Sequence, residues 1–151
     1  IAIKQFLFSE IKNSDFLFAN QFAYTNQFLI ARKFSREFSL QISPTLVHYN
    51  LLPLNQINHD QFSIGYGARY KLNNRMSINV ESFYQLNSEN NINQLSFGFD
   101  IETGGHVFQL HMTNSAFMID RAFIHETYDS WLEGDIYFGF NISRVFTLKD
   151  K

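Results

Sequence analysis

The 151-residue sequence predicts an all-β protein, an antiparallel transmembrane β-barrel formed by a single domain over residues 1–151. Aromatic residues make up 17% of the chain, with eighteen Phe and seven Tyr, yet they are interleaved with Asn, Gln, Ser and charged residues. Apolar and polar residues alternate over many short segments, and the connections between these segments are short and long in turn. A sheet with one face in lipid and the other around a polar lumen requires such alternation.

Composition and charge exclude several other classes of protein. No stretch approaches the roughly 18 apolar residues that a membrane-spanning helix requires. The absence of cysteine excludes disulfides and thiolate metal sites. A net charge of −2 and a pI near 6.2 give no basis for binding nucleic acid. Neither a metal nor a cofactor is expected, because the spacing of the five histidines matches no ligand motif: His48, His59, His106, His111 and His125.

Seven or eight strands follow from the alternation, each with apolar residues at every second position. They are expected at residues 1–8, 16–33, 38–46, 62–72, 76–85, 95–102, 108–113 and 135–143. The first strand is the weakest prediction because its parity is mixed. In the fourth, Phe62, Ile64 and Tyr66 alternate with Ser63 and Gly65. The apolar set is expected to face lipid and the polar set the lumen.

The connections are of two kinds that strictly alternate along the chain. The short ones lie at 34–37, 73–75 and 104–105, and the longer, polar ones at 50–60, 87–93 and 115–134. Outer-membrane barrels have tight periplasmic turns and long external loops, so the pattern predicts the bacterial outer membrane. Ile1 is not an initiator residue and lies in or against a strand. We therefore expect the C-terminal part of a longer barrel.

Several segments resemble an uncharacterised family of β-barrel proteins found in Bacteroidetes-type bacteria, known only as a domain of unknown function. The segments are LIARKF at 29–34, PTLVH at 44–48, FDIETGGHVFQLH at 99–111, TNS at 113–115, GDI at 134–136 and FGFNISRVFTL at 138–148. The similarity spans about residues 20–149, and the run at 99–111 is specific. Members of that family are longer, with a signal peptide and further strands before this region. The resemblance implies a fold and a location, but no activity and no catalytic residues.

Charged and polar residues are predicted to line the lumen. They are Arg69, Lys71, Glu81, Asp100, Glu102, His111 and Asp135. Pairing across the turn at 104–105 places Asp100 opposite Gln109 and diagonal to His111. Pairing across 73–75 places Arg69 near Glu81. Such groups would either line a selective pore or form a network of paired charges that fills a narrow barrel.

His111 and Thr113 are the candidate catalytic residues. They resemble the His-x-Ser-Asn motif of outer-membrane lipid A deacylases and phospholipases, in which His activates a Ser hydroxyl. Thr is a more hindered nucleophile than Ser. The parity also directs both side chains to the lumen, whereas a site that cleaves lipid must open to the bilayer.

The long segment 115–134 is too apolar for a simple solvated loop, since it contains Phe117, Met118, Phe123 and Trp131. It is expected either to pack on its neighbours or to form an interaction site, by folding inward as a plug, contacting lipopolysaccharide or binding another protein.

Three functions are compatible with these features. The first is a non-enzymatic barrel that acts as a scaffold or subunit of an outer-membrane complex. The alternatives are a channel for small solutes and an outer-membrane lipid acyl hydrolase centred on His111 and Thr113. The expected partners are outer-membrane lipid and other outer-membrane or periplasmic proteins.

Overall fold

The computed structural model describes residues 2–9, 22–52, 58–87 and 92–144, which form one antiparallel sheet of eight strands and one short helix. The strands are β1 (Ala2–Ser9), β2 (Phe22–Lys33), β3 (Phe38–Tyr49), β4 (Asp60–Lys71), β5 (Met76–Gln85), β6 (Gln94–Thr103), β7 (His106–Thr113) and β8 (Tyr137–Arg144). Each strand pairs with its neighbours in the sequence. The predicted all-β, antiparallel fold is confirmed.

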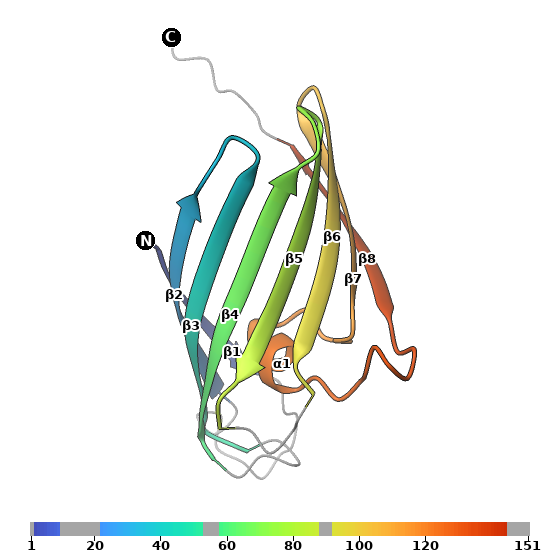
Figure 1. The fold of residues 1–151 in the computed structure, drawn as a ribbon. Coiled ribbons are helices and arrows are strands. Elements are labelled where there is room, and N and C mark those ends of the chain that lie inside the picture. Colours follow the sequence, from blue (N-terminus) through green and yellow to red (C-terminus); the bar gives the residue numbers. More distant parts are fainter. Residues whose placement is uncertain (1, 10–21, 53–57, 88–91, 145–151) are drawn as a thin grey trace.

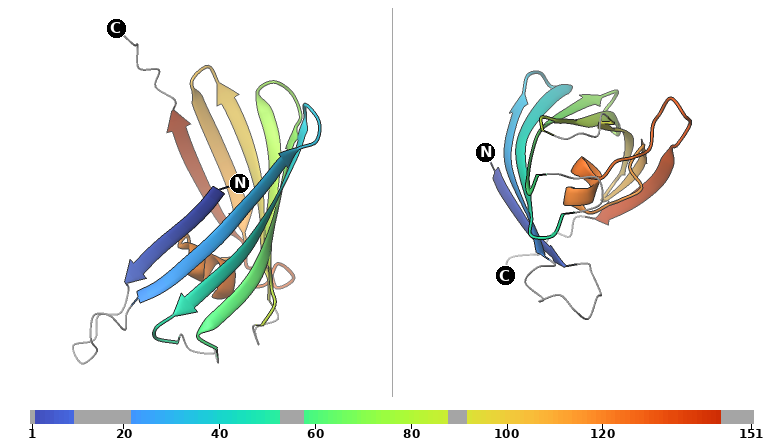
Figure 2. Two further views of the ribbon diagram at one scale, coloured as in Figure 1. Left: turned by 90° about the vertical axis from the view of Figure 1, so that its left-hand side faces the viewer. Right: turned by 90° about the horizontal axis from the view of Figure 1, so that it is seen from below.

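The sheet curls around a lumen, with its strands side by side and tilted (Figure 1). Seen along the lumen, it forms an incomplete ring with β1 and β8 at its two edges (Figure 2). No ladder joins β1 to β8 among the described residues. The fold is therefore an open barrel.

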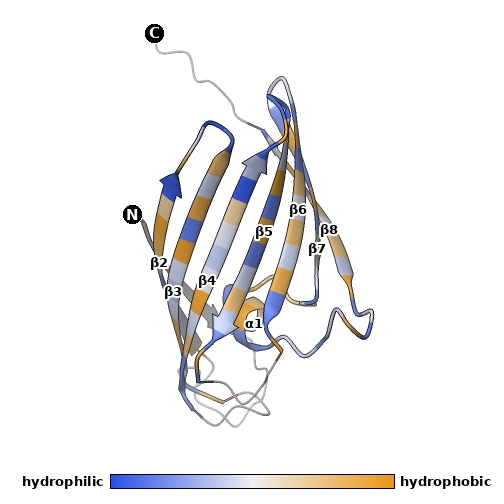
Figure 3. Cartoon of the chain, viewed as in Figure 1, coloured by the Kyte–Doolittle hydropathy of each residue, from blue (hydrophilic) through white to orange (hydrophobic). Residues whose placement is uncertain are grey.

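Apolar and polar residues alternate along the strands (Figure 3), and their exposure shows that the two faces of the sheet differ as this alternation predicts. Large apolar side chains point outward and are exposed, among them Phe28, Ile30, Ile42, Phe62, Leu110, Phe138 and Phe140. Polar side chains point inward and are buried, among them Thr25, Gln27, Thr45, Gln61, Ser63, Gln94 and Thr113. A soluble domain has the opposite arrangement, with apolar side chains inside. An apolar exterior around a polar lumen instead suits a lipid environment.

The connections sort by length at the two ends of the barrel, as predicted. Residues 34–37, 72–75 and 104–105 form tight turns at one end, which we call the short-turn end. The turn between β6 and β7 needs positive φ at two positions, which Gly104 and Gly105 supply. The longer connections lie at the opposite end, the long-loop end.

Several predicted strand boundaries differ from the structure by one to three residues, and β3, for example, ends at Tyr49 instead of at residue 46. The last strand was expected from residue 135 but begins at Tyr137, so Asp135 precedes it. The reason is a turn, in which the backbone N–H groups of Glu133 and Asp135 donate to the carbonyl of Ser130. In the strand predicted at 16–33, residues 16–21 lie outside the described residues, and β2 covers the remainder.

The connection between β7 and β8 contains the helix α1 (Asp120–His125). The helix lies inside the curl of the sheet, near the long-loop end (Figure 2). Its residues Ala122, Ile124 and His125 are buried. Across the part of the chain that the structure describes, no helix is long and apolar enough to cross a membrane.

Candidate functional site

The predicted lumen residues lie on the inner face of the sheet, with one exception. Arg69 and Lys71 on β4, Glu81 on β5, Asp100 and Glu102 on β6 and His111 on β7 share the parity of the buried polar residues. Asp135 instead lies in the connection before β8.

A polar network crosses four strands of the inner face. The guanidinium of Arg69 lies 3.4 Å from the carboxylate of Asp100 and donates to the hydroxyl of Ser77 at 2.9 Å. That hydroxyl donates to Asp100 at 3.3 Å, and the amide of Gln109 donates to the other oxygen of Asp100 at 3.1 Å. Asp100 is 8% exposed and Arg69 is 47% exposed. The network therefore holds a buried carboxylate whose cationic partner reaches solvent.

The predicted pairing of Asp100 with Gln109 is present in the register of β6 and β7. The register of β4 and β5 places Arg69 opposite Asn79 and Glu81 opposite Gly67, which makes Arg69 and Glu81 diagonal neighbours. The guanidinium nevertheless turns to Ser77 and Asp100, because the curl of the sheet brings β6 within its reach. Lys71 and Glu102 are exposed and lie close to the short turns.

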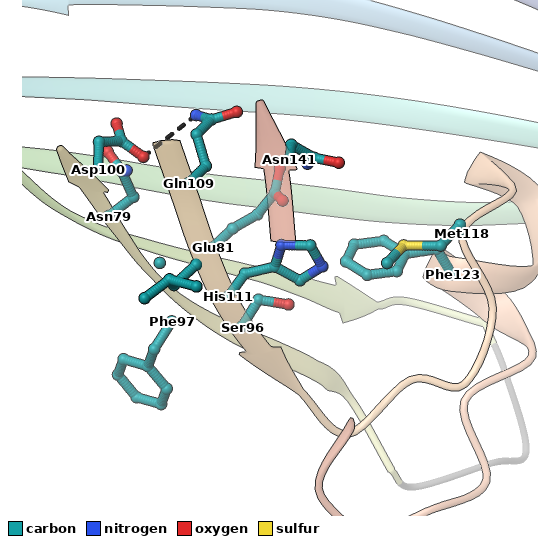
Figure 4. Close-up of a pocket in the computed structure, with 12 residues that line it drawn as sticks. Asn79, Glu81, Ser96, Phe97, Asp100, Gln109, His111, Met118, Phe123 and Asn141 are labelled. Carbon is teal, nitrogen blue, oxygen red and sulfur yellow. Dashed lines mark hydrogen bonds between the residues drawn. The ribbon is translucent and has the colours of Figure 1, made fainter. Parts of the chain in front are cut away.

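A hollow of about 330 Å³ opens next to this network (Figure 4). Polar residues Glu81, Ser96 and His111 line it from the sheet, and Met118 and Phe123 line it from the segment that carries α1. The hollow is amphipathic and could hold a small polar molecule.

His111 and Thr113 lie on the same inner face, but their side chains contact different neighbours. The imidazole of His111 covers Gly139, where an added Cβ would overlap the ring. The hydroxyl of Thr113 is buried, accepts from the backbone N–H of Ser115 at 3.2 Å and lies 3.4 Å from the amide nitrogen of Gln94. No hydrogen bond joins His111 to Thr113 among the described residues. In the described structure, the hydroxyl of Thr113 therefore contacts Ser115 and Gln94 and not the imidazole of His111.

The other histidines are dispersed over the barrel. His48 faces outward and lies 2.7 Å from the carboxylate of Asp60. His59 lies 2.6 Å from the carbonyl oxygen of Tyr49, and His106 is on the opposite face of β7 from His111. Within the described ranges, no three His, Asp or Glu side chains gather as metal ligands.

Helix α1 and its flanks, residues 114–131, are fastened to the lumen wall by hydrogen bonds, and we call this segment the plug. The amide of Gln85 on β5 donates to the carbonyl of Ile124 at 3.0 Å. The hydroxyl of Tyr49 on β3 lies 3.1 Å from the carboxylate of Glu126, which also pairs with Arg121 at 2.6 Å. Because β3 and β5 lie at different places on the curved sheet, these contacts hold the plug inside the lumen.

Aromatic contacts complete the packing of the plug. Phe123 meets Phe83 of β5 edge to face, with ring centroids 6.3 Å apart. Trp131 packs edge to face on the outward Phe97 at 5.5 Å, and its indole N–H donates to the carbonyl of Leu95 at 3.0 Å. Phe117 and Met118 remain exposed. Helix α1 thus lies inside the lumen, which is one of the arrangements predicted for the segment, whereas Trp131 packs on the outward Phe97.

His125 was predicted in a loop, but the structure places it in the last turn of α1, where it is completely buried. Burial disfavours the charged imidazolium and lowers the pKa of His125 to about 4. The plug is therefore docked with a neutral histidine at its centre.

The anchors of the plug were not among the predicted site residues. Gln85 and Tyr49 lie at the loop ends of their strands and point inward, and Asn114 donates to the carbonyl of Asp129 at 2.9 Å. The inward parity of Gln85 and Tyr49 was available from the alternation. The sequence did not indicate the path of the plug, which these residues hold.

An open antiparallel barrel with an apolar exterior, a polar lumen and an inserted helix defines a membrane β-barrel. A family model described as "Membrane bound beta barrel domain (DUF5777)" matches residues 3–146, and the chain belongs to this family. No curated protein and no solved structure matches the chain.

Proposed function

We propose that this membrane-bound barrel is a plugged, non-enzymatic protein of the bacterial outer membrane that acts as a scaffold or subunit of a larger complex. The observation that carries the proposal is the plug. Its hydrogen bonds to β3 and β5 and its buried residues Ile124 and His125 hold it inside the lumen, where an open pore would need a free passage.

The architecture supports the proposed location in the outer membrane. Membrane barrels of antiparallel strands with short turns at one end and long loops at the other are typical of outer membranes, where the short turns face the periplasm. By the same rule, the plugged end would face outward from the cell.

The edges of the sheet support a role in assembly. Unpaired backbone groups cost several kcal/mol each in hydrocarbon, so β1 and β8 require pairing within the bilayer. Strands of a larger barrel or strands of another subunit would supply it.

The first test is conductance in planar bilayers. The unaltered protein should be silent, whereas a variant that lacks residues 117–130 and retains its β-sheet circular dichroism should give discrete steps. Stable steps from the unaltered protein would contradict the plugged state. The assembly itself is tested by native electrophoresis of protein extracted from membranes in mild detergent. A species of monomer size alone would contradict the subunit role.

A channel for small solutes is the second candidate, because the amphipathic hollow lies behind the plug and Arg69, Lys71 and Glu102 are exposed toward the short-turn end. In this case the plug would act as a gate. Conductance that appears under voltage in the unaltered protein and changes its ion selectivity in Arg69→Gln would favour the channel over the scaffold.

A further inference from the structure

The outer face of the sheet carries a groove of about 310 Å³ across β2, β3, β4 and β5. Two neighbouring cross-strand rows form its floor. The row nearer the short turns runs from Arg32 through Leu40 and Ala68 to Val80, and the next runs from Ile30 through Ile42 and Tyr66 to Ser82. Because this face of a membrane barrel meets lipid, the groove is open to the bilayer.

The groove exists because two small side chains interrupt rows of large ones. Ala68 lies between Leu40 and Val80, and Ser82 lies beside Tyr66. The hydroxyl of Ser82 donates to the carbonyl of Gln94 at 2.7 Å, so it offers no free donor to the groove. The floor is therefore an apolar furrow, which suits a hydrocarbon chain.

One charged residue lines the groove, and it lies at the end next to the short turns. The guanidinium of Arg32 is 5.1 Å from the centre of the Phe34 ring, and this ring also lines the groove. Arg32 is exposed, and in the described ranges no carboxylate pairs with it. A guanidinium presents several N–H donors that match the oxygens of a phosphate.

The charge around Arg32 favours an anionic ligand. Among the described residues, the short turns and the two strand residues nearest to that end carry six basic residues and two carboxylates: Arg32, Lys33, Arg36, Lys71, Arg75 and Arg144, against Glu37 and Glu102. Basic residues near a membrane surface attract anionic lipid headgroups. The rim and the furrow together thus match the two parts of an anionic phospholipid.

We infer that this groove is a specific binding site for an anionic phospholipid, with an acyl chain over Ala68 and Ser82 and the headgroup phosphate on Arg32. The lipid belongs to the leaflet that the short turns contact. The site is independent of the plug and of the lumen residues, since it lies on the opposite face of the sheet.

The test is native mass spectrometry of the full chain in detergent with phosphatidylglycerol and phosphatidylcholine of identical acyl chains in equal amounts. The unaltered protein should retain phosphatidylglycerol preferentially. Arg32→Gln should weaken this retention by about tenfold, the effect of losing one charged hydrogen bond. Ala68→Phe, which fills the furrow and keeps every charge, should weaken retention of both lipids.

Arg36→Gln is the matched control, because it removes a positive charge from the same rim at a residue that does not line the groove. It should retain phosphatidylglycerol like the unaltered protein. Equal retention of the two lipids, or an equal loss in Arg36→Gln and Arg32→Gln, would overturn the specific site. Displacement of the lipid by inorganic phosphate would also overturn it, because the furrow would then contribute nothing. If Arg32→Gln fails to fold, Ala68→Phe alone decides the question.

Discussion

The two ends of the barrel differ although the same strands form both. At the long-loop end the inward residues are buried, as Val47, Gln61 and Gln94 show. At the short-turn end the inward residues Arg69 and Lys71 are exposed. The charge also differs. In the described connections and strand termini of the long-loop end there are six acidic residues and one basic residue: Asp60, Asp120, Glu126, Asp129, Glu133 and Asp135, against Arg121.

The comparison teaches that the connections, and not the strands, decide which end of the lumen holds a packed helix. A turn of two to four residues cannot reach back into the barrel. The connection between β7 and β8 is long enough to place a helix in the lumen, and it carries the apolar residues that packing requires. The long-loop end should therefore be sensitive to changes in the plug, and the short-turn end to changes in surface charge.

The largest expected effect is the loss of the plug in Ile124→Asp. Ile124 is 0% exposed, and burying an unpaired carboxylate in its place should cost about 4 kcal/mol of docking free energy. Limited proteolysis of the folded barrel should then cleave residues 114–136. Leu132→Asp is the control, because Leu132 is 98% exposed and should tolerate the change. Equal protection of the two variants would show that the plug is not held by burial.

The next effect is a dependence of plug docking on pH. The docked pKa of His125 is lowered to about 4 by burial, whereas the undocked value is 6.5. The undocked state therefore binds the proton more tightly. Docking is fully stable above pH 6.5 and loses about 3 kcal/mol as the pH falls to 4. Trp131 is the only Trp of the chain, so its fluorescence should report the change. In His125→Gln the spectrum should stay constant over this range, and the same response there would assign the titration to another group.

A smaller effect is expected at the boundary between the two ends, in Asp100→Ala. The change removes the carboxylate that pairs with Arg69, which keeps only the hydroxyl of Ser77 as an acceptor. It also leaves the amide of Gln109 and the hydroxyl of Ser77 without the acceptor that Asp100 provides. Since Arg69 is about half exposed, water compensates in part and the free energy of unfolding should fall by about 2 kcal/mol. Glu102→Ala, at an exposed position on the same strand, should change it by less than about 0.5 kcal/mol. Urea unfolding in detergent measures the free energy of unfolding of both variants. Equal losses in Asp100→Ala and Glu102→Ala would show that the network adds nothing to stability.

The smallest expected effect is that of Tyr49→Phe. The variant removes the hydroxyl that meets Glu126 and the carbonyl of Arg121, which should weaken plug docking by about 1 kcal/mol. Tyr84→Phe is the matched control, because Tyr84 faces outward and is exposed. The readout is the pH at the midpoint of the transition in Trp131 fluorescence. This midpoint shifts to higher pH when docking weakens. An unshifted transition in Tyr49→Phe would show that this hydroxyl does not contribute to plug docking.

The sequence by itself determined the strands, their faces and the sorting of the connections. These features are local, since a period of two and a turn of two to four residues are visible within about ten residues. The inward positions of Arg69, Asp100 and His111 follow from that parity alone. The pairing of Asp100 with Gln109 was also accessible, because a two-residue turn fixes the register of β6 and β7.

Only the tertiary structure decided where the connection between β7 and β8 lies and which residues Arg69 contacts. Both depend on the curvature of the sheet, which brings residues of β3 and β5 to a segment more than thirty-five positions away, as with Gln85 and Ile124. Alternation specifies which face a side chain occupies but carries no information on that curvature. The burial of His125 could not be predicted from the sequence for the same reason, because the strands around it are distant in the sequence.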